Sequence, residues 1–214
     1  MAQPAGWFGD RAVLVQVDSV AERESIASWL ARQMPDTLIR RGMESVLIET
    51  PIPDPHLLAT VEHHLSSIDE AATESVEQEE VLIVVDYSGA DLADTAAFFG
   101  ITPSQLISAH TSQIWCVAMM GFSPGFGYLE PLDDPQLPWA TLPRRENPRA
   151  QVPKGSVAVA AGMSAVYPSS SPGGWNLLGT TTTRLFDPTD DANPTLLRPG
   201  LRVHFIVGPD GKPA

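Results

Sequence analysis

A serine flanked by glycines is the first place in this sequence where chemistry could occur. Residues 121–125 (GFSPG) have the G-x-S-x-G spacing of a nucleophile elbow, in which the N–H of the residue after the serine binds an oxyanion. Here that residue is Pro124, which has no N–H, and Pro131 soon interrupts the stretch where a helix would follow. We therefore do not expect Ser123 to be an acyl-enzyme nucleophile, and the catalytic residues stay unknown.

The other reactive side chains form no recognisable site. His56, His63 and His64 lack the H-E-x-x-H arrangement, so we expect no metal centre. Cys116 lies in the apolar run IWCVAMM without a basic neighbour, which indicates a small buried hydrophobe rather than a reactive thiol. The sequence contains no G-x-x-x-x-G-K-[ST] motif, so we expect no P-loop for ATP in this chain.

Two segments combine glycines and a proline with aromatic residues, 121–129 (GFSPGFGYL) and 172–179 (PGGWNLLG). The glycines permit sharp turns or close approach to a ligand, and the aromatic rings offer a rigid apolar wall. A second interpretation is that both are tight barrel turns whose aromatic residues belong to the core. Between them, residues 143–149 (PRRENPR) place arginines beside prolines, where guanidinium groups are held ready for a carboxylate or phosphate.

The overall charge limits the partners. The 214 residues carry a formal net charge of −13, which disfavours nucleic acid and anionic membranes. From residue 143 onward, however, eight Lys or Arg residues face five acidic ones, which suits a small anionic substrate. No stretch approaches the ~18 apolar residues of a spanning helix and the opening does not resemble a signal peptide, so we predict a cytoplasmic protein.

The periodicity of the chain predicts an α+β protein with two domains. The first part has the order β-α-β-β-α-β, which indicates a ferredoxin-like α/β domain over residues 1–94. Two short helices are expected next, one starting at Asp91 and one over 103–109 capped by Thr102. After them, brief apolar runs divided by Gly and Pro are typical of a β-barrel, and the barrel domain is expected to cover residues 95–214. The elements expected in the first part are strands 12–17, 37–40, 45–49 and 81–85, a helix capped by Ser19 and a helix capped by Asp54.

Four blocks in the second part resemble one known family. GFSPGFGYL, LPRRENPRAQVPKGSVAVA, AVYPSSSPGGWNLLGTT and RLFDP are similar, in this order, to the family of B-type 5-oxoprolinase subunits, whose members are also called kinase A inhibitor or allophanate hydrolase subunit 1. The resemblance implies a small α/β domain followed by a cyclophilin-like β-barrel of the carboxyltransferase type. One departure is Thr180, which stands where the family usually has an arginine, and it leaves the true substrate open.

The resemblance also implies a function and a site. Members act with a C-type and an A-type subunit to open 5-oxoproline to L-glutamate at the expense of ATP, with Mg²⁺ as a further candidate component, so the chain alone is expected to be inactive. Two alternatives stay open: a regulatory protein that inhibits a histidine kinase, and a subunit of a urea- or allophanate-processing carboxylase or hydrolase. The substrate-binding residues implied are Phe122, Pro124, Gly125, Phe126, Tyr128, Arg144, Arg149, Tyr167, Pro172, Gly173, Gly174 and Trp175.

Overall fold

The chain forms two compact units, residues 1–78 and 79–214. The computed structural model describes residues 4–42, 44–68, 79–132 and 134–208. The division falls earlier than the expected boundary between residues 94 and 95. Residues 69–80 (DEAATESVEQEE) form an acidic stretch before the run 81–85, and residues 69–78 of it lie outside the described residues.

The first unit is a four-stranded antiparallel sheet with two helices. Its strand order is β1-β2-β4-β3, and the helices α1 and α2 pack on the sheet around a core that includes Val15, Leu30 and Ile48. The elements are β1 (Ala5–Trp7), β2 (Ala12–Gln16), α1 (Val20–Gln33), β3 (Leu38–Arg41), β4 (Ser45–Glu49) and α2 (Leu57–Ser66).

The sequence predicted the start of α1 correctly and the start of α2 too early. The Ser19 hydroxyl accepts a hydrogen bond from the Glu22 N–H, and the Glu22 carboxylate accepts one from the Asp18 N–H, so the predicted cap of α1 is confirmed. The second helix begins at Leu57, later than expected. Asp54 instead accepts a hydrogen bond from the His56 N–H in the preceding turn.

The predicted β-α-β-β-α-β unit is wrong at its last strand. The run 81–85 is a strand, β5 (Glu80–Val85), but it pairs in parallel with β13 (Arg202–Val207) in the second unit. The place beside β2 in the first sheet is taken by β1, which pairs with β2 as a hairpin. A continuous apolar run identifies a buried strand but not which sheet receives it.

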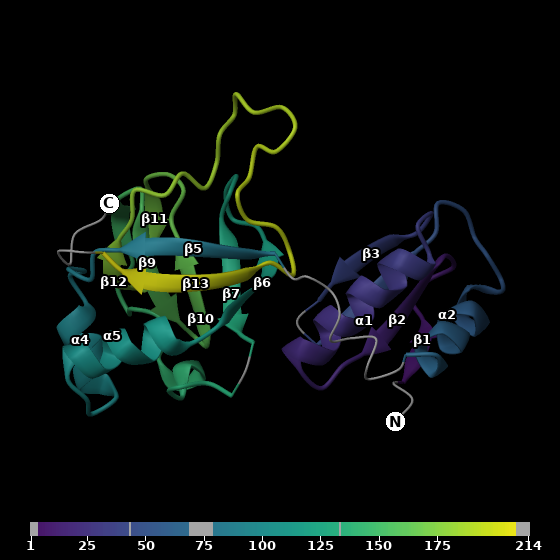
Figure 1. Ribbon diagram of the computed structural model, residues 1–214, viewed down its shortest axis with the longest axis horizontal. Helices are drawn as coiled ribbons and strands as arrows, with labels where there is room; N and C mark the ends of the chain where they lie inside the picture. Colours follow the sequence, from purple (N-terminus) through teal and green to yellow (C-terminus); the bar gives the residue numbers. More distant parts are fainter. Residues whose placement is uncertain (1–3, 43, 69–78, 133, 209–214) are drawn as a thin grey trace. The chain divides into compact units, whose positions relative to one another are not determined.

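The second unit confirms the predicted barrel. Seven of its described strands form one sheet in the order β12-β9-β10-β7-β6-β13-β5, and a bridge between Asp86 and Thr180 joins the two ends into a nearly closed sheet, consistent with a cyclophilin-like barrel (Figure 1). The other strands are β6 (Trp115–Met120), β7 (Gly127–Pro131), β8 (Arg149–Val152), β9 (Ser156–Ala160), β10 (Met163–Val166), β11 (Ser171–Gly173) and β12 (Asn176–Thr180), with β8 and β11 as a separate pair.

Closure of the barrel depends on two glycines. The N–H of Gly89 donates to the carbonyl of Leu178, so the segment after β5 runs directly against β12. A Cβ on Gly89 would lie 2.3 Å from the Leu178 carbonyl carbon, and one on Gly179 would lie 2.3 Å from the Asp86 carbonyl oxygen. Because both obstacles are backbone, only glycine allows this approach.

Helices α4 (Leu92–Phe98) and α5 (Pro103–Ser112) lie at one end of the barrel in Figure 1. The second helix begins with a full capping box, since Thr102 and Gln105 bond each other's backbone N–H, as the sequence predicted for Thr102. A short 3-10 turn, η1 (Trp139–Thr141), adds a buried tryptophan to the barrel core.

A chain of polar groups crosses that core. The Tyr87 hydroxyl lies 2.8 Å from Nδ1 of His110, and Nε2 of His110 lies 3.0 Å from the Ser164 hydroxyl, which donates in turn to the Ala158 carbonyl. One neutral tautomer, protonated on Nε2, satisfies every bond. Burial lowers the pKa of His110 from 6.5 to about 3, so the ring is neutral in the folded protein.

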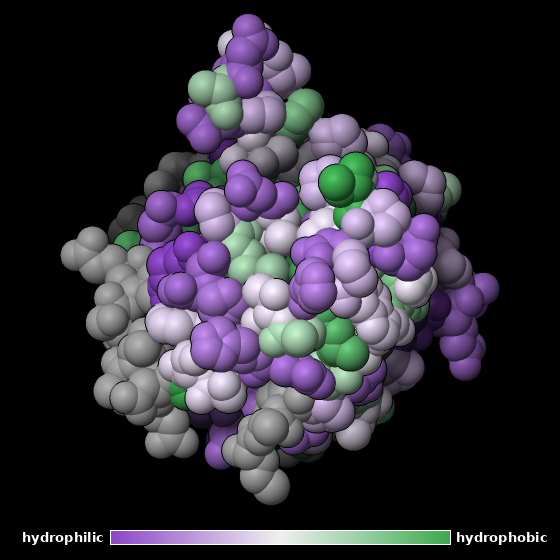
Figure 2. All heavy atoms as spheres, turned by 90° about the vertical axis from the view of Figure 1, so that its right-hand side faces the viewer, coloured by the Kyte–Doolittle hydropathy of each residue, from purple (hydrophilic) through white to green (hydrophobic). Residues whose placement is uncertain are grey.

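The surface is mixed in character. Figure 2 shows one face on which hydrophilic residues predominate and hydrophobic residues form small, separate groups. No helix among the described residues is long and apolar enough to cross a membrane.

Replacing Gly89 with alanine is expected to destabilise the second unit by about 3 kcal/mol, because the new methyl group meets backbone that cannot move aside. Amide hydrogen exchange of β9, followed as the urea concentration rises, gives a midpoint that measures this loss of stability. Gly121→Ala is the control, since its Cβ would meet only the Tyr128 ring, at 3.5 Å. Equal midpoints for the two variants would contradict the closure argument.

The neutral His110 makes stability depend on pH. Below about pH 6.5 the unfolded chain takes up a proton that the native ring refuses, so native stability falls by about 1.4 kcal/mol per pH unit until about pH 3. The contribution is complete above pH 6.5 and is lost as the pH falls. Urea unfolding of wild type and His110→Gln between pH 7.5 and 4.5 should show converging stabilities. The substitution of an exposed histidine, His63→Gln, is the control.

Candidate functional site

A small pocket on the barrel gathers most of the residues implied as substrate-binding. Its volume is about 110 Å³, which suits a small molecule rather than a large cofactor. Nine of the twelve implied residues line it: Phe122, Phe126, Tyr128, Arg144, Tyr167, Pro172, Gly173, Gly174 and Trp175. We call this the aromatic pocket.

Edge-to-face ring contacts hold the wall of the aromatic pocket. The Phe126 ring lies at the centre, with centroids 5.2 Å from Phe122, 5.0 Å from Tyr128, 5.4 Å from Tyr167 and 6.1 Å from Trp175. The interplanar angles, between 65° and 82°, are those that aromatic pairs prefer. The rings therefore brace one another without a ligand.

Two residues of this wall differ in exposure. Trp175 is 5% exposed and packs in an apolar cluster with Phe126 and Tyr167, so it is both core and pocket wall. The two sequence interpretations of this residue are therefore not exclusive. Phe122 is 60% exposed and adopts φ +64°, a left-handed backbone that is costly for a bulky residue and is found at ligand-binding turns.

The remaining implied residues shape the turns. Gly173 gives room to Tyr167, since a Cβ there would lie 2.3 Å from the Tyr167 hydroxyl. Gly125, at φ +80°, lets the turn pass against the Phe186 side chain. Pro124 is exposed in the same turn and, like Gly125, is not part of the pocket lining.

Arg144 supplies a positive charge to the aromatic pocket. Its guanidinium carbon lies 6.0 Å from the centroid of the Trp175 ring, a cation–π arrangement. Arg144 is exposed and has no ion pair among the described residues. Burial raises the pKa of the Tyr167 hydroxyl, although the charge of Arg144 partly opposes this. The pocket therefore offers an anion the cation of Arg144 and the neutral phenol of Tyr167.

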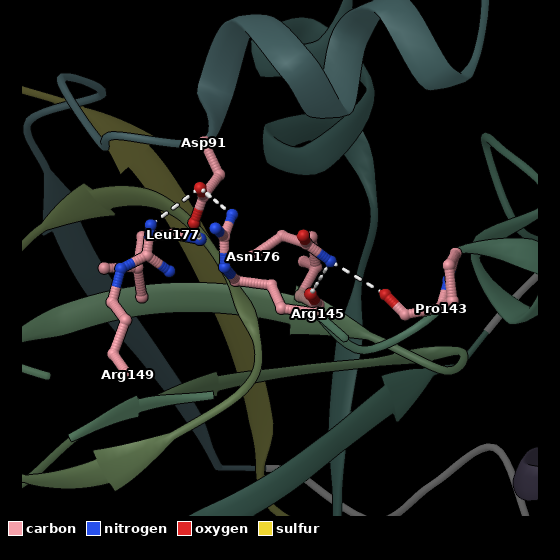
Figure 3. A network of polar contacts seen from close by, with 7 residues as sticks. Asp91, Pro143, Arg145, Arg149, Asn176 and Leu177 are labelled. Atoms are coloured by element: carbon pink, nitrogen blue, oxygen red, sulfur yellow. Dashed lines mark hydrogen bonds and ion pairs between the residues drawn. The ribbon is translucent and has the colours of Figure 1, made fainter. Parts of the chain in front are cut away.

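Arg149, also implied as a substrate contact, is held by the protein itself. Its Nη2 donates to Oδ1 of Asp91 at 2.7 Å, and Nη1 of Arg145 donates to the same oxygen at 2.6 Å (Figure 3). The other oxygen of Asp91 accepts the N–H of Leu177 at 2.8 Å. Arg149 does not line the aromatic pocket, and the Asp91 carboxylate takes the place expected for a ligand.

The Asp91 carboxylate stays charged although it is 2% exposed. Burial alone would raise its pKa, but the hydrogen bonds from Arg149 and Leu177 and the charges of Arg149 and Arg145 outweigh burial, so the pKa is lowered. The sequence predicted Asp91 only as the start of a helix. Its side chain makes no capping hydrogen bond for α4, which only the structure shows, so the sequence carried no signal of its other role.

No conventional catalytic group is assembled among the described residues of the site. The Ser123 hydroxyl is buried without a hydrogen-bond partner in this part of the chain, so no base activates it. Within the same described ranges, no group of three or more His, Cys, Asp or Glu side chains could hold a metal ion. Cys116 is buried, as predicted. The site is therefore suited to binding and orienting a small molecule.

The chain belongs to the family described as carboxyltransferase domain, subdomain C and D, which residues 5–197 match. A relative in Escherichia coli O157:H7, named as the B-type subunit of 5-oxoprolinase, is 38% identical over 173 residues, which cover 79% of this chain and 77% of that protein. These findings confirm the resemblance seen in the sequence blocks.

Solved structures agree on the fold. The crystal structure of TTHA0988 superposes with a TM-score of 0.67 at 31% identity over 92% of this chain, which spans only 40% of that chain. The urea carboxylase of Kluyveromyces lactis superposes with a TM-score of 0.60 at 18% identity, covering 96% of this chain and 22% of that one. The second likeness shows the fold alone.

Replacing Asp91 with asparagine is expected to cost roughly 2–3 kcal/mol, below the ~3–5 of a fully buried pair because both guanidinium groups are partly exposed. Since the pKa of Asp91 is lowered in the folded state, its contribution is complete above the unfolded value near 3.8 and is lost as the pH falls through the folded value. Urea unfolding at pH 7 should show the loss in Asp91→Asn and not in Asp94→Asn, an exposed carboxylate on the same helix. Equal stabilities would mean that the arginines do not need this partner.

Proposed function

We propose that this chain is a subunit of a cytoplasmic 5-oxoprolinase complex in which the aromatic pocket holds 5-oxoproline. The observation that carries the proposal is the pocket itself: apolar rings and the guanidinium group of Arg144 in about 110 Å³. 5-Oxoproline has a small lactam ring, whose planar amide and apolar CH₂ groups suit an aromatic wall, and one carboxylate, which suits the guanidinium group of Arg144. The name of the Escherichia coli relative supports the same activity.

The proposed role of the chain is to bind and orient. Opening the lactam requires activation of its carbonyl, whose oxygen would take the γ-phosphate of ATP with release of ADP. Attack of water and cleavage of the C–N bond would then leave an acyl phosphate, which a second water would hydrolyse to L-glutamate and phosphate. Arg144 would hold the carboxylate while the rings of Phe126 and Trp175 fix the plane of the lactam, an orientation effect on the reaction. ATP, with Mg²⁺, is proposed to bind within the complex with the C-type and A-type partners, because this sequence has no P-loop. The catalytic base is not assigned.

Of the two alternatives, a regulatory protein that inhibits a histidine kinase has one observation in its favour. The exposed ring of Phe122 at the edge of an aromatic pocket also suits a proline-containing peptide. The urea- or allophanate-processing alternative is supported by the fold likeness alone.

The test is reconstitution with the C-type and A-type subunits, with 5-oxoproline-dependent release of ADP as the measurement. The chain alone should be inactive and the complex active. Arg144→Gln should raise the KM for 5-oxoproline about tenfold or more, because a charge-assisted contact is lost, with little change in melting temperature. Arg184→Gln, on a loop away from the pocket lining, is the control.

Two results would refute the proposal. One is turnover by the chain alone, which would remove the need for partners. The other is a complex in which Arg144→Gln has the KM of wild type, because the carboxylate then lies elsewhere. Tight binding of a proline-rich peptide without any 5-oxoproline turnover in the complex would favour the regulatory alternative.

A further inference from the structure

A second, larger cavity lies on the same unit between helix α4 and residues 142–147. Its volume is about 340 Å³, within the range of natural ligand sites. Figure 3 shows three of its lining residues: Asn176 donates to the Pro143 carbonyl, and Arg145 reaches Asp91. We call it the α4 pocket. It shares Arg144 with the aromatic pocket, but its other lining residues are different.

The charges around the α4 pocket are balanced. Arg144 and Arg145 contribute two cations, and Asp94 and Glu146 contribute two carboxylates. A purely anionic ligand would meet both carboxylates, and a purely cationic one would meet both guanidinium groups. A molecule with one positive and one negative end satisfies both kinds of group. The ring of Phe98, which is 49% exposed, adds an apolar surface.

Unsatisfied polar atoms point to a ligand in this pocket. Thr95 lines it and is only 2% exposed, yet its hydroxyl has no hydrogen-bond partner among the described residues. Nε of Arg145 is likewise buried without a partner, whereas Nη1 is fixed by Asp91. Since buried polar groups in native proteins are almost always hydrogen-bonded, both donors are suited to an acceptor supplied from outside.

We propose that the α4 pocket binds a zwitterionic α-amino acid. The carboxylate of the amino acid faces Arg145 and the Thr95 hydroxyl, and its ammonium group faces Asp94 and Glu146. The side chain of the amino acid lies against Phe98. This site is separate from the proposed 5-oxoproline site and does not rest on it, because 5-oxoproline carries no ammonium group.

The experiment is a titration of the isotope-labelled full chain, followed by amide chemical shifts, with a panel of the common L-amino acids. The best binder is then compared with its two matched analogues, the acid that lacks the ammonium group and the amine that lacks the carboxylate. Each analogue should bind at least ~10-fold more weakly, the effect of one lost charge contact. Absence of binding throughout the panel would overturn the proposal.

Variants locate the site. Asp94→Asn and Thr95→Val should each weaken amino-acid binding by about tenfold, with melting curves as the check on folding. Phe122→Ala, in the aromatic pocket, is the matched control and should bind the amino acid as wild type does. If the acid analogue binds as well as the amino acid, or Asp94→Asn has wild-type affinity, the pocket is not a zwitterion site. Neither outcome affects the turnover of 5-oxoproline by the reconstituted complex, so the two proposals fail separately.

Discussion

The carboxylate of Asp91 joins the parts of the barrel on which the candidate site depends. One oxygen accepts the backbone N–H of Leu177 in β12, and the other accepts guanidinium groups from Arg145 and Arg149. Burying a charge is costly, and three short charge-assisted hydrogen bonds offset that cost. Asp91 thereby connects residues 143–149, which include Arg144, with β12, the strand that begins directly after Trp175.

Asp91 can reach these partners because of the way the barrel closes. The chain leaves β5 at Asp86, runs along β12 and enters α4, and Gly89 and Gly179 make this close passage possible. Any side chain at Gly89 would push the strand segment outward and carry the Asp91 carboxylate away from Leu177. The contacts that close the sheet therefore also place the Asp91 carboxylate beside its partners.

Much of the fold follows from local signals that act over a few residues. The caps at Ser19 and Thr102 were predicted from sequence because the bonding groups are three positions apart. The strand β4 was predicted with its bounds because it is a compact apolar run. The partner of β5 was not, because β5 pairs with β13, more than a hundred residues further along the chain, and nothing in the run itself distinguishes that sheet from the first one.

The same division applies to the site. Much of the aromatic pocket comes from two short blocks of glycines and rings, 121–129 and 172–179, which the sequence singled out, whereas Tyr167 was implied only by the family resemblance. Asp91 was missed because its partners lie 54, 58 and 86 positions away. A guanidinium group beside a proline looks the same in sequence whether its partner is a ligand or the protein itself.

The distribution of the three arginines gives the site its character. Arg145 and Arg149 are oriented and partly neutralised by one buried carboxylate, so both lend rigidity to the site, and Arg145 has its Nε left for a ligand. Arg144, their neighbour in sequence, keeps its charge available and lines both pockets. The segment 143–149 thus contains the two arginines that bind Asp91 and the arginine that is available to a ligand. Because Asp91 fixes the first two, the position of Arg144 is restricted as well.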